Sequence, residues 1–351
     1  MMQTQLFNAT AQAENGARAA GAILRGGGLV AFATETVYGL GANGLDEDAV
    51  LRIFEAKGRP SDNPLILHVA KKSDVKELWL RVTDNARALM DVFWPGPLTL
   101  VYPRRAVVPD VVSAGLDTVA VRMPDHKSAL ALIRAAGVPV AAPSANLSGK
   151  PSPTTAEHVK EDFWGKIDAI IDGGPCRVGL ESTVLSLTGR PTILRPGGIT
   201  KEMLEAVIGA VEVSPAVLSP LKEGERPSAP GMKYRHYAPD AKVLVAAPAE
   251  PKAAAALICR AYDRRTQAGE SCVVFATTQT QAFYKNRKHV IIGDRNHPET
   301  LCASLFAALR AQSGEADVIF CEALPENDMG LAYMNRVLRA AGFEMLGGEN
   351  G

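Results

Sequence analysis

One segment of this 351-residue chain interrupts an otherwise regular alternation of helix-like and strand-like stretches. Residues 212–240, EVSPAVLSPLKEGERPSAPGMKYRHYAPD, contain five prolines and keep neither a helical nor a strand period. Proline fixes φ and removes a backbone donor, so such a stretch is typical of a linker. Because a single hydrophobic core rarely grows beyond about 250 to 300 residues, we expect two domains, residues 1–211 and 241–351, joined by this linker.

The first domain is predicted to be α/β with a twisted sheet of parallel and antiparallel strands. A helix over AENGARAAGAILRGGG precedes the apolar run LVAFAT, and a second helix over DEDAVLRIFEAKG has Asp46 as N-cap and Gly58 as its stop. Strands are expected near LILHV, LTLVYP, DTVAVRMP, VPVAAP, DAIIDGG, STVLSL and PTILRPG. Helices at about residues 84–93, 126–136 and 154–162 separate only some of these strands, which favours a mixed sheet.

The second domain alternates more cleanly. Strands are expected at KVLVAA, CVVFAT, HVIIG and DVIFCEAL, and helices at PKAAAALICRAYDRR, PETLCASLFAALRAQ and GLAYMNRVLRAAGF. This order predicts a small parallel α/β domain with right-handed crossovers.

Composition limits the class of function. Lys and Arg total 38 and Asp and Glu also total 38, so the chain lacks the broad basic field with which nucleic-acid-binding proteins neutralise phosphates. The five cysteines form no C-x-x-C pair and show no metal-ligand spacing, so reduced thiols are expected. No apolar run approaches the roughly 20 residues needed to cross a bilayer, and the N-terminus does not resemble a secretory signal. A cytoplasmic protein is predicted.

Polar loops at strand ends are the candidate sites of chemistry. The chain has no G-x-x-x-x-G-K-[ST] motif, no nucleophile elbow and no zinc-ligand spacing among its histidines. The loops are ATETVYGLGANG, KGRPSDNP, APSANLSGKPSPTT, LESTV and LRPGG. Ligands of open α/β sheets bind in the crevice at strand ends, so we expect these loops to converge.

Each loop also has an ordinary structural interpretation. Lys57 and Arg59 are typical of cations that end a helix and oppose its dipole. His68 fits a core histidine with satisfied hydrogen bonds, SANLSG fits a simple turn, and YRHY fits a linker anchor. Arg122 and Arg195 fit surface arginines at strand ends. No single motif decides between these alternatives.

Taken together, the motifs TETVYGL, KGRPSDNPL, TVAVRMP, PSANLSGKPSPT, ESTV, LRPG and PGMKYRHYAP resemble the threonylcarbamoyl-AMP synthase family in its long form. The resemblance implies a YrdC-like, DHBP-synthase-like catalytic domain followed by a Rossmann-like domain. It also implies a nucleotidyltransferase that makes threonylcarbamoyl-AMP and pyrophosphate from L-threonine, bicarbonate or CO2, and ATP. A separate transferase complex would then use the product to modify the adenosine beside the anticodon of tRNA.

The same resemblance assigns roles to particular residues. Lys57 and Arg59 are the implied catalytic cations. The implied ATP contacts are Lys57, Arg59, Asn63, Thr118, Ser144, Asn146, Ser152, Arg195, His236 and Tyr237. The implied threonine contacts are Thr36, His68, Arg122 and Ser182, and the implied lid comprises Lys233, Tyr234 and Arg235. Mg2+ would be held through the ATP phosphates, with no protein metal site and no tightly bound organic cofactor.

These assignments agree with what the reaction requires. Adenylation places negative charge on phosphate oxygens, so it needs fixed cations and donors rather than a protein nucleophile. Lys supplies a point charge and Arg a planar fork, and Arg122 is a natural partner for the substrate carboxylate. A site that binds the threonine hydroxyl rejects valine strongly, whereas exclusion of serine rests on one methyl group, about 1 to 3 kcal/mol.

Two other classes of function stay open at this point. An RNA-binding module acting in translation or ribosome assembly is one, although the zero net charge and the lack of an aromatic and basic stripe count against it. Carbamoyl transfer from carbamoyl phosphate, as in hydrogenase maturation factors, is the other. Those factors carry zinc-finger segments, for which this chain has no cysteine pattern.

Overall fold

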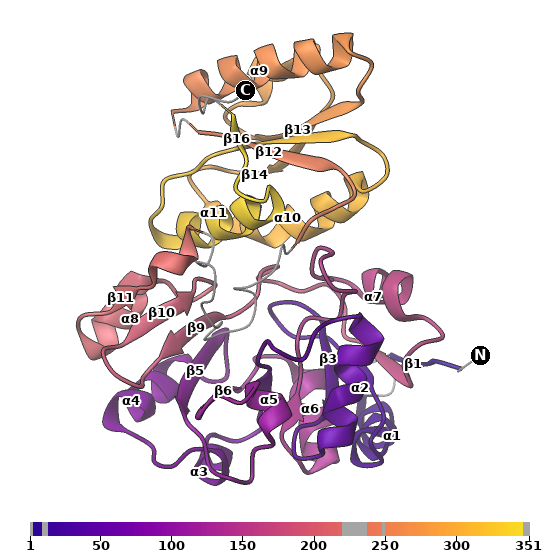
Figure 1. The fold of residues 1–351 in the computed structure, drawn as a ribbon, viewed down its shortest axis with the longest axis vertical. Helices are drawn as coiled ribbons and strands as arrows, with labels where there is room; N and C mark the ends of the chain where they lie inside the picture. Colours follow the sequence, from indigo (N-terminus) through magenta and orange to yellow (C-terminus); the bar gives the residue numbers. More distant parts are fainter. Residues whose placement is uncertain (1–2, 9–12, 220–236, 248–249, 347–351) are drawn as a thin grey trace. The chain divides into compact units, whose positions relative to one another are not determined.

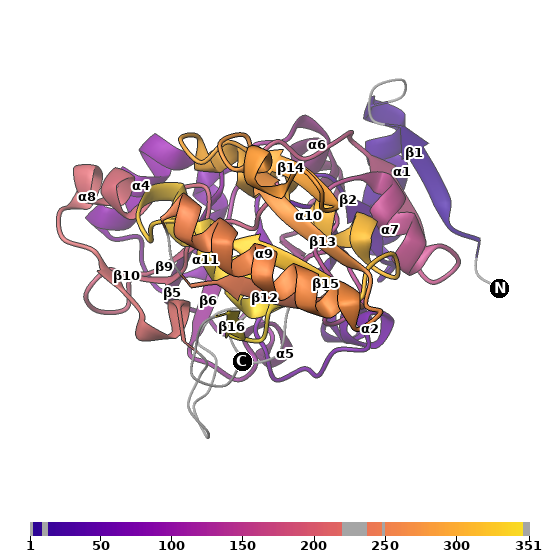
Figure 2. The ribbon, with the colours of Figure 1, turned by 90° about the horizontal axis from the view of Figure 1, so that it is seen from above.

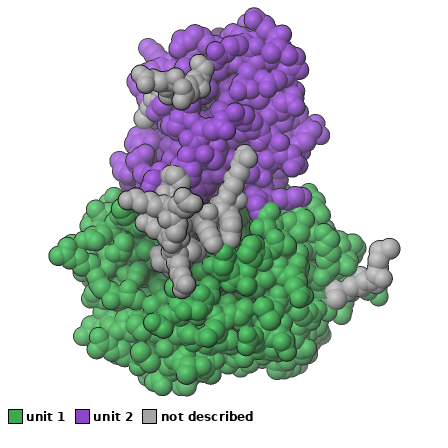
Figure 3. Space-filling model, viewed as in Figure 1, with its two compact units in different colours: residues 1–148, 152–217, 221–233 green, residues 149–151, 218–220, 234–351 purple. Residues whose placement is uncertain are grey.

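The computed structural model describes residues 3–8, 13–219, 237–247 and 250–346. The chain divides into two compact units, coloured green and purple in Figure 3. Unit 1 comprises residues 1–148, 152–217 and 221–233, and unit 2 comprises residues 149–151, 218–220 and 234–351. Among the described residues, no helix is both long enough and apolar enough to span a membrane.

Unit 1 is built on an 11-stranded sheet in the order β1-β8-β2-β3-β7-β4-β6-β5-β9-β10-β11 (Figure 1). Its strands are β1 (Gln5–Asn8), β2 (Val30–Phe32), β3 (Gly39–Asn43), β4 (Ile66–His68), β5 (Leu98–Pro103), β6 (Thr118–Arg122), β7 (Val140–Ala141), β8 (Ala169–Asp172), β9 (Thr183–Ser186), β10 (Thr192–Arg195) and β11 (Glu212–Val213). The sheet contains parallel pairs such as β4–β6 and antiparallel pairs such as β5–β6. The predicted mixed α/β sheet is confirmed.

The helices of unit 1 include those expected from the sequence. They are α1 (Ala13–Arg25), α2 (Glu47–Lys57), α3 (Val75–Leu78), α4 (Asp84–Phe93), α5 (Asp110–Ser113), α6 (Lys127–Ala136), α7 (Ala156–Phe163) and α8 (Lys201–Ile208), with single 3-10 turns at η1 (Lys72–Asp74) and η2 (Pro215–Val217). The Asp46 side chain accepts from the Ala49 N–H, and Gly58 ends α2 in the left-handed region at φ 60°. Both predicted caps are therefore confirmed.

The loop prediction for ATETVYGLGANG was wrong in its second half, which is strand β3. This strand pairs antiparallel with both β2 and β7. A Cβ on Gly41 would lie 2.8 Å from Val140 Cγ1 and 2.9 Å from a Phe32 ring carbon, so only glycine fits there. A strand that needs glycine for close packing lacks the β-branched signature on which strand prediction depends. The edge strand β1 was also not predicted, and it precedes α1 in the chain.

The two faces of the sheet differ in chemistry. In the central strands, alternate residues such as Leu67, Val121 and Leu185 point into the large hydrophobic core of unit 1. Their neighbours point the other way, where Ile66, Val101, Ala120 and Val184 form a small separate cluster. We call this second side the cluster face. Side chains alternate along a strand, so any residue two positions from this cluster lies on the same face.

Unit 2 contains a five-stranded sheet in the order β14-β13-β15-β12-β16. Its elements are β12 (Lys242–Ala246), α9 (Pro251–Gln267), β13 (Cys272–Thr277), η3 (Gln281–Tyr284), β14 (His289–Gly293), α10 (Pro298–Gln312), β15 (Val318–Glu322), α11 (Asp328–Ala340) and β16 (Met345–Leu346). Every pair is parallel, which confirms the prediction of a parallel α/β unit. Helix α9 covers one face of this sheet and α10 and α11 the other (Figure 1); Figure 2 shows α9 lying across the strands.

Candidate functional site

A row of polar side chains crosses the middle of the unit 1 sheet in register. His68 on β4 pairs with Arg122 on β6, and Arg122 pairs with Thr99 on β5. Thr99 pairs with Val184 on β9, and Val184 pairs with Arg195 on β10. Residues in register across a sheet project to the same side, so this row lies on the cluster face. The sheet itself therefore aligns two arginines, a histidine and a threonine that are far apart in sequence.

A β-bulge brings Arg195 to this face. Ile193 pairs with Leu185 and belongs to the large core, so strict alternation would turn Arg195 into that core as well. The register shifts by one residue between Ile193 and Arg195, and Arg195 then pairs with Val184 of the cluster face. An extra residue in one strand re-aims the side chains that follow it, and that is its effect here.

Arg122 is held by three contacts. Its Nη2 lies 2.7 Å from Glu35 Oε2, its Nη1 donates to Thr36 Oγ1 at 2.9 Å, and its Nε donates to the Gly96 carbonyl at 3.2 Å. The Arg122 side chain is 4% exposed and the Glu35 side chain 2%. Thr36 and Arg122, both implied threonine contacts, are thus brought together, and Glu35 is a site residue that was not predicted from the sequence.

Ser182 links the predicted threonine and ATP contacts. Its hydroxyl lies 2.7 Å from Thr99 Oγ1, Arg195 Nη2 donates to it at 3.2 Å, and Arg195 Nε donates to the Ser182 carbonyl at 3.1 Å. One residue earlier, Glu181 Oε1 accepts from the Ser152 hydroxyl at 2.5 Å. All five side chains are buried, so the surface-arginine interpretation of Arg195 does not hold.

His68 is a neutral imidazole in this environment. Its ring is 4% exposed, Nδ1 lies 3.2 Å from the Ile66 carbonyl, and the ring meets Phe32 edge to face. Burial, together with the nearby Arg122 cation, lowers the pKa of His68 to about 3. A neutral ring offers a hydrogen-bonding group without a charge. The imidazole can serve as a polar contact but not as a resident cation near neutral pH.

Lys57 is buried at the end of α2 and is not a solvated helix-end charge. It is 3% exposed, and its Nζ donates to the carbonyls of Ser144 and Asn146 at 2.6 Å and 2.5 Å. The Ser144 hydroxyl in turn donates to Asn146 Oδ1 at 2.5 Å. The Lys57 ammonium therefore binds the turn at residues 144–146, which we call the SAN turn, to the end of α2. Three of the predicted ATP contacts meet here.

Arg59 and Asn63 lie in the turn that leads from α2 to β4. Arg59 Nη2 donates to the Asn63 carbonyl at 3.1 Å, and its guanidinium lies 5.7 Å from the centre of the Phe54 ring. The Asn63 side chain is fully buried, yet neither its amide nitrogen nor its oxygen has a hydrogen-bond partner among the described residues.

Backbone contacts join the loops that carry these side chains. The Tyr38 N–H donates to the Pro153 carbonyl, and the Ala145 N–H donates to the Tyr38 carbonyl. The Val178 N–H donates to the Glu35 carbonyl at 2.7 Å. The loops at residues 34–38, 143–153 and 176–182 therefore adjoin, as the sequence analysis expected of loops at strand ends.

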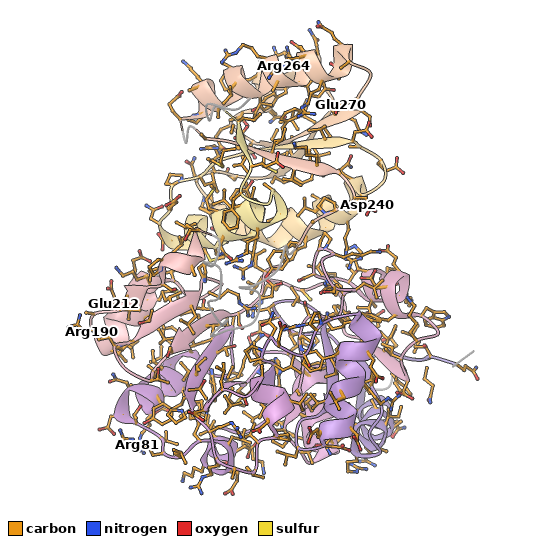
Figure 4. The ribbon with its side chains drawn as sticks, in the orientation of Figure 1. Arg81, Arg190, Glu212, Asp240, Arg264 and Glu270 are labelled. Carbon is orange, nitrogen blue, oxygen red and sulfur yellow. The ribbon has the colours of Figure 1, made fainter. Side chains whose placement is uncertain are left out.

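The remaining predicted residues lie elsewhere. Thr118 is at the opposite end of β6 from Arg122, about 13 Å along the strand, and lines an open depression of about 520 Å³ with Val101 and Leu194. Arg190 and Glu212 also line this depression and pair at 3.1 Å; both are labelled in Figure 4. Tyr237 belongs to unit 2, where its ring packs 4.9 Å from that of Phe306. Lys233, Tyr234, Arg235 and His236 lie outside the described residues.

Buried polar atoms without partners are concentrated in this site. Five belong to three residues: both carboxylate oxygens of Glu35, both amide atoms of Asn63, and Nη2 of Arg122 lack an aligned hydrogen bond among the described residues. The Glu35–Arg122 contact is thus an ion pair rather than a linear hydrogen bond. Native proteins leave few buried polar groups unsatisfied, and a ligand is a common reason for those that remain. Among the described residues, no group of three or more His, Cys, Asp or Glu is arranged to hold a metal ion.

The fold and the site define a two-unit α/β protein with a candidate ligand site on one face of its larger sheet. Residues 22–197 match the Sua5/YciO/YrdC family model, described as telomere recombination, and residues 199–342 match the model for the threonylcarbamoyl-AMP synthase C-terminal domain. The chain belongs to the threonylcarbamoyl-AMP synthase family, which confirms the resemblance carried by its motifs.

Relatives and solved structures support this membership over nearly the full length. The threonylcarbamoyl-AMP synthases of Pyrococcus abyssi and Bacillus subtilis are each 49% identical to this chain, covering 94% and 92% of it and 95% and 92% of their own lengths. The crystal structure of P. abyssi Sua5 complexed with L-threonine gives a TM-score of 0.91 at 46% identity and 98% coverage of both chains. E. coli YciO gives a TM-score of 0.50 at 27% identity, covering 56% of this chain and 96% of its own.

Proposed function

We propose that this protein is an L-threonylcarbamoyladenylate synthase, a nucleotidyltransferase that converts L-threonine, bicarbonate or CO2, and ATP into threonylcarbamoyl-AMP and pyrophosphate. The observation that carries the proposal is the buried row on the cluster face, where Arg122 and its partners adjoin the loops that bear the predicted ATP contacts. Membership of the synthase family, and the L-threonine bound by the P. abyssi relative, support it.

The geometry suggests how the two substrates are divided. Arg122 would bind the threonine carboxylate with the N–H groups that its three protein contacts leave, and Thr36, His68 and Ser182 would surround the rest of the amino acid. The adenylate would use the turn from Lys57 to Asn63 and the loop from Ser144 to Ser152. Arg195 would contact the phosphates.

In this scheme, catalysis comes from positioning and charge. The threonine carbamate attacks the α-phosphorus of ATP in line, and pyrophosphate leaves. Lys57 and Arg59 provide the fixed positive charge that the departing phosphates need. Mg2+ would arrive with ATP and be held by phosphate oxygens and water. Asn63, whose buried amide lacks partners, is suited to receive a polar group of the nucleotide.

Several wider features belong to the same proposal. The segment at Lys233, Tyr234, Arg235, His236 and Tyr237 would act as a lid that limits hydrolysis of the product. A tRNA threonylcarbamoyl transferase complex would consume threonylcarbamoyl-AMP. The five free cysteines favour a cytoplasmic setting.

The decisive assay is release of pyrophosphate from ATP by the purified full-length protein. Release should require both L-threonine and bicarbonate, and replacing L-threonine with valine should abolish it. Release that ignored threonine would contradict the proposal. Truncation after residue 210 tests the lid separately, because an unchanged yield of threonylcarbamoyl-AMP would exclude it.

A further inference from the structure

Glu35 is a buried charge in the site to which none of the proposed substrate contacts gives a role. Its side chain is 2% exposed, and Oε2 lies 2.7 Å from Arg122 Nη2. The other oxygen, Oε1, has no hydrogen-bond partner among the described residues. A buried acceptor left without a donor keeps its full desolvation cost, and that cost is larger when the acceptor is charged. A donor supplied by a ligand would remove that cost.

The hydroxyl groups that flank Glu35 in sequence cannot supply this donor. Thr34 Oγ1 donates to the Val37 carbonyl at 2.6 Å. Thr36 Oγ1 lies 2.8 Å from Thr34 Oγ1 and accepts from Arg122. A hydroxyl has one proton, so the Thr34 proton is committed to Val37 and the Thr36 proton to Thr34. The two hydroxyls therefore hold the loop and the Arg122 guanidinium in place, and neither has a proton left to donate to Glu35.

The titratable groups around Glu35 leave it facing a single cation. Arg122 comes from β6, His126 follows that strand, and Cys176 lies on the loop after β8; His68 on β4 is next to Arg122. Burial lowers the pKa of His126 and of His68, and burial raises the pKa of Cys176 to about 12. Near neutral pH these three groups are uncharged. The local charges are the Glu35 carboxylate and the Arg122 guanidinium.

We propose that Glu35 binds the α-ammonium group of the amino-acid substrate at Oε1 and takes a proton from it. The inference rests on the proposed function, in which that amine must be neutral to capture CO2. An amino acid carries its carboxylate and ammonium on one carbon, and the site offers a cation and an anion side by side. A zwitterion placed against this pair gives each of the four charges an opposite partner, which is what burial of charge requires.

An N–H bond of the ammonium breaks, its electron pair stays on nitrogen, and the proton forms an O–H bond with Oε1. The neutral amine then forms a C–N bond to CO2 as one C–O π bond opens, and it loses its second proton, which passes to solvent water when CO2 is taken up directly. When bicarbonate is the source, its dehydration gives CO2 and hydroxide, and the hydroxide takes the second amine proton as water. The products are the carbamate, water and protonated Glu35, which returns its proton to solvent.

Binding measurements test the ammonium contact without requiring turnover. We would measure by calorimetry the affinities for L-threonine and for its analogue 2,3-dihydroxybutyrate, in which a hydroxyl replaces the ammonium. The wild-type protein should prefer L-threonine by about 10- to 100-fold, the range of a hydrogen bond between charged groups. Glu35→Gln should reduce that preference to about threefold or less, while an unchanged preference would overturn the proposal.

Glu322→Gln is the matched control. Glu322 is a buried carboxylate of unit 2 that lies 2.8 Å from Arg295, so its loss also breaks a buried Arg–carboxylate pair. This variant should keep the full preference for L-threonine. If it lost the preference as Glu35→Gln does, the effect would be structural and the proposal would fail. Should Glu35→Gln not fold, Glu35→Asp decides: a preference reduced at least fivefold supports the contact, and an unchanged one overturns it.

The pH profile tests the proton transfer. In Glu35→Gln, kcat should fall about 100-fold or more and rise with pH as the free amine becomes available, because loss of a general base typically costs about 10²- to 10⁴-fold. Glu35→Asp should keep the shape of the wild-type profile at a lower level. A Glu35→Gln profile parallel to that of the wild type would exclude the base role. If the wild-type protein released no pyrophosphate in response to threonine, the proposed function would fail, and the binding preference would still report on Glu35.

Discussion

The two units each bury an arginine paired with a glutamate, and the two pairs differ in how completely they are satisfied. In unit 2, Glu322 Oε2 lies 2.8 Å from Arg295 Nη1, and Glu322 Oε1 accepts a hydrogen bond from the Tyr284 hydroxyl at 2.8 Å. In unit 1, Glu35 Oε2 forms an ion pair with Arg122, and Glu35 Oε1 has no hydrogen-bond partner among the described residues. Both carboxylates are at most 2% exposed.

This difference separates a structural ion pair from a functional one. A buried pair with all its acceptors filled is complete, so it fixes the packing of the elements that carry it. A buried pair with an open acceptor is stable only if the rest of the fold holds it, and it gains when a ligand supplies the missing group. Burial and distance alone do not distinguish the two cases. The count of unfilled donors and acceptors does.

The largest effect on activity should come from Arg122→Lys, and Arg295→Lys is the matching change in unit 2. Arg122→Lys keeps the charge but removes the planar fork, so kcat/KM for threonine-dependent pyrophosphate release should fall about 10³-fold. Arg295→Lys, measured on the folded fraction, should stay within about twofold of the wild type. Equal losses of kcat/KM in the two variants would contradict the distinction between a functional pair in unit 1 and a structural pair in unit 2.

The next largest effect should come from Lys57→Met. Methionine preserves the stem but leaves the Ser144 and Asn146 carbonyls without their donor, so the SAN turn should shift. We expect kcat/KM for ATP to fall about 100-fold. A variant with normal ATP kinetics would restrict Lys57 to a role in stability, which urea unfolding would then reveal.

Tyr284→Phe makes the unit 2 pair resemble the unit 1 pair. It leaves Glu322 Oε1 without a donor, so the free energy of unfolding should fall by about 2 kcal/mol. Activity per folded molecule should not change. If the stability of this variant matched that of the wild type, an unfilled acceptor would be less costly than the comparison assumes.

The smallest effect concerns pH and the neighbour of Arg122. His68 has a folded pKa of about 3, below its ordinary value near 6.5, so the unfolded chain binds more protons at intermediate pH. The stability that His68 contributes is fully present above about pH 6.5 and is lost as pH falls toward 3. Between pH 7.5 and 5.5 the loss should be on the order of 1 kcal/mol.

His68→Asn should remove that part of the pH dependence, measured as the free energy of unfolding at the two pH values. Burial also lowers the pKa of His126, so His126→Asn should likewise reduce the loss of unfolding free energy between pH 7.5 and 5.5. If His68→Asn retained the whole wild-type difference, the imidazole would be less buried than the structure shows.

Sequence patterns predicted what depends on local chemistry. The caps of α2 at Asp46 and Gly58 follow from residue type, and so does the alternation that gives unit 2 its parallel sheet. The polar loops at strand ends were also visible, because polar and small residues directly follow apolar runs. The resemblance to a family predicted that the separate loops form one site. The residues of each loop taken alone were equally consistent with ordinary turns and solvated charges.

Features that depend on distant partners were not visible in the sequence. Glu35 stands between two threonines with no periodic signal, and its partner Arg122 belongs to another strand. Strand β3 was hidden because Gly41 is required by Val140 and Phe32 across the sheet. The buried state of Lys57 depends on carbonyls of the SAN turn, which a helix-end pattern does not report. Each of these was decided by tertiary contacts.

The bulge in β10 makes the site sensitive to the length of the chain as well as to its side chains. Leu194 is the extra residue, so deleting it would restore uninterrupted pairing between β9 and β10 and leave Arg195 opposite Val184 on the cluster face. Such a deletion should remove the packing of Leu194 against the cluster and keep the contact between Arg195 and Ser182. Inserting a residue opposite Leu194 in β9 would instead restore strict alternation and turn the Arg195 guanidinium toward the large core.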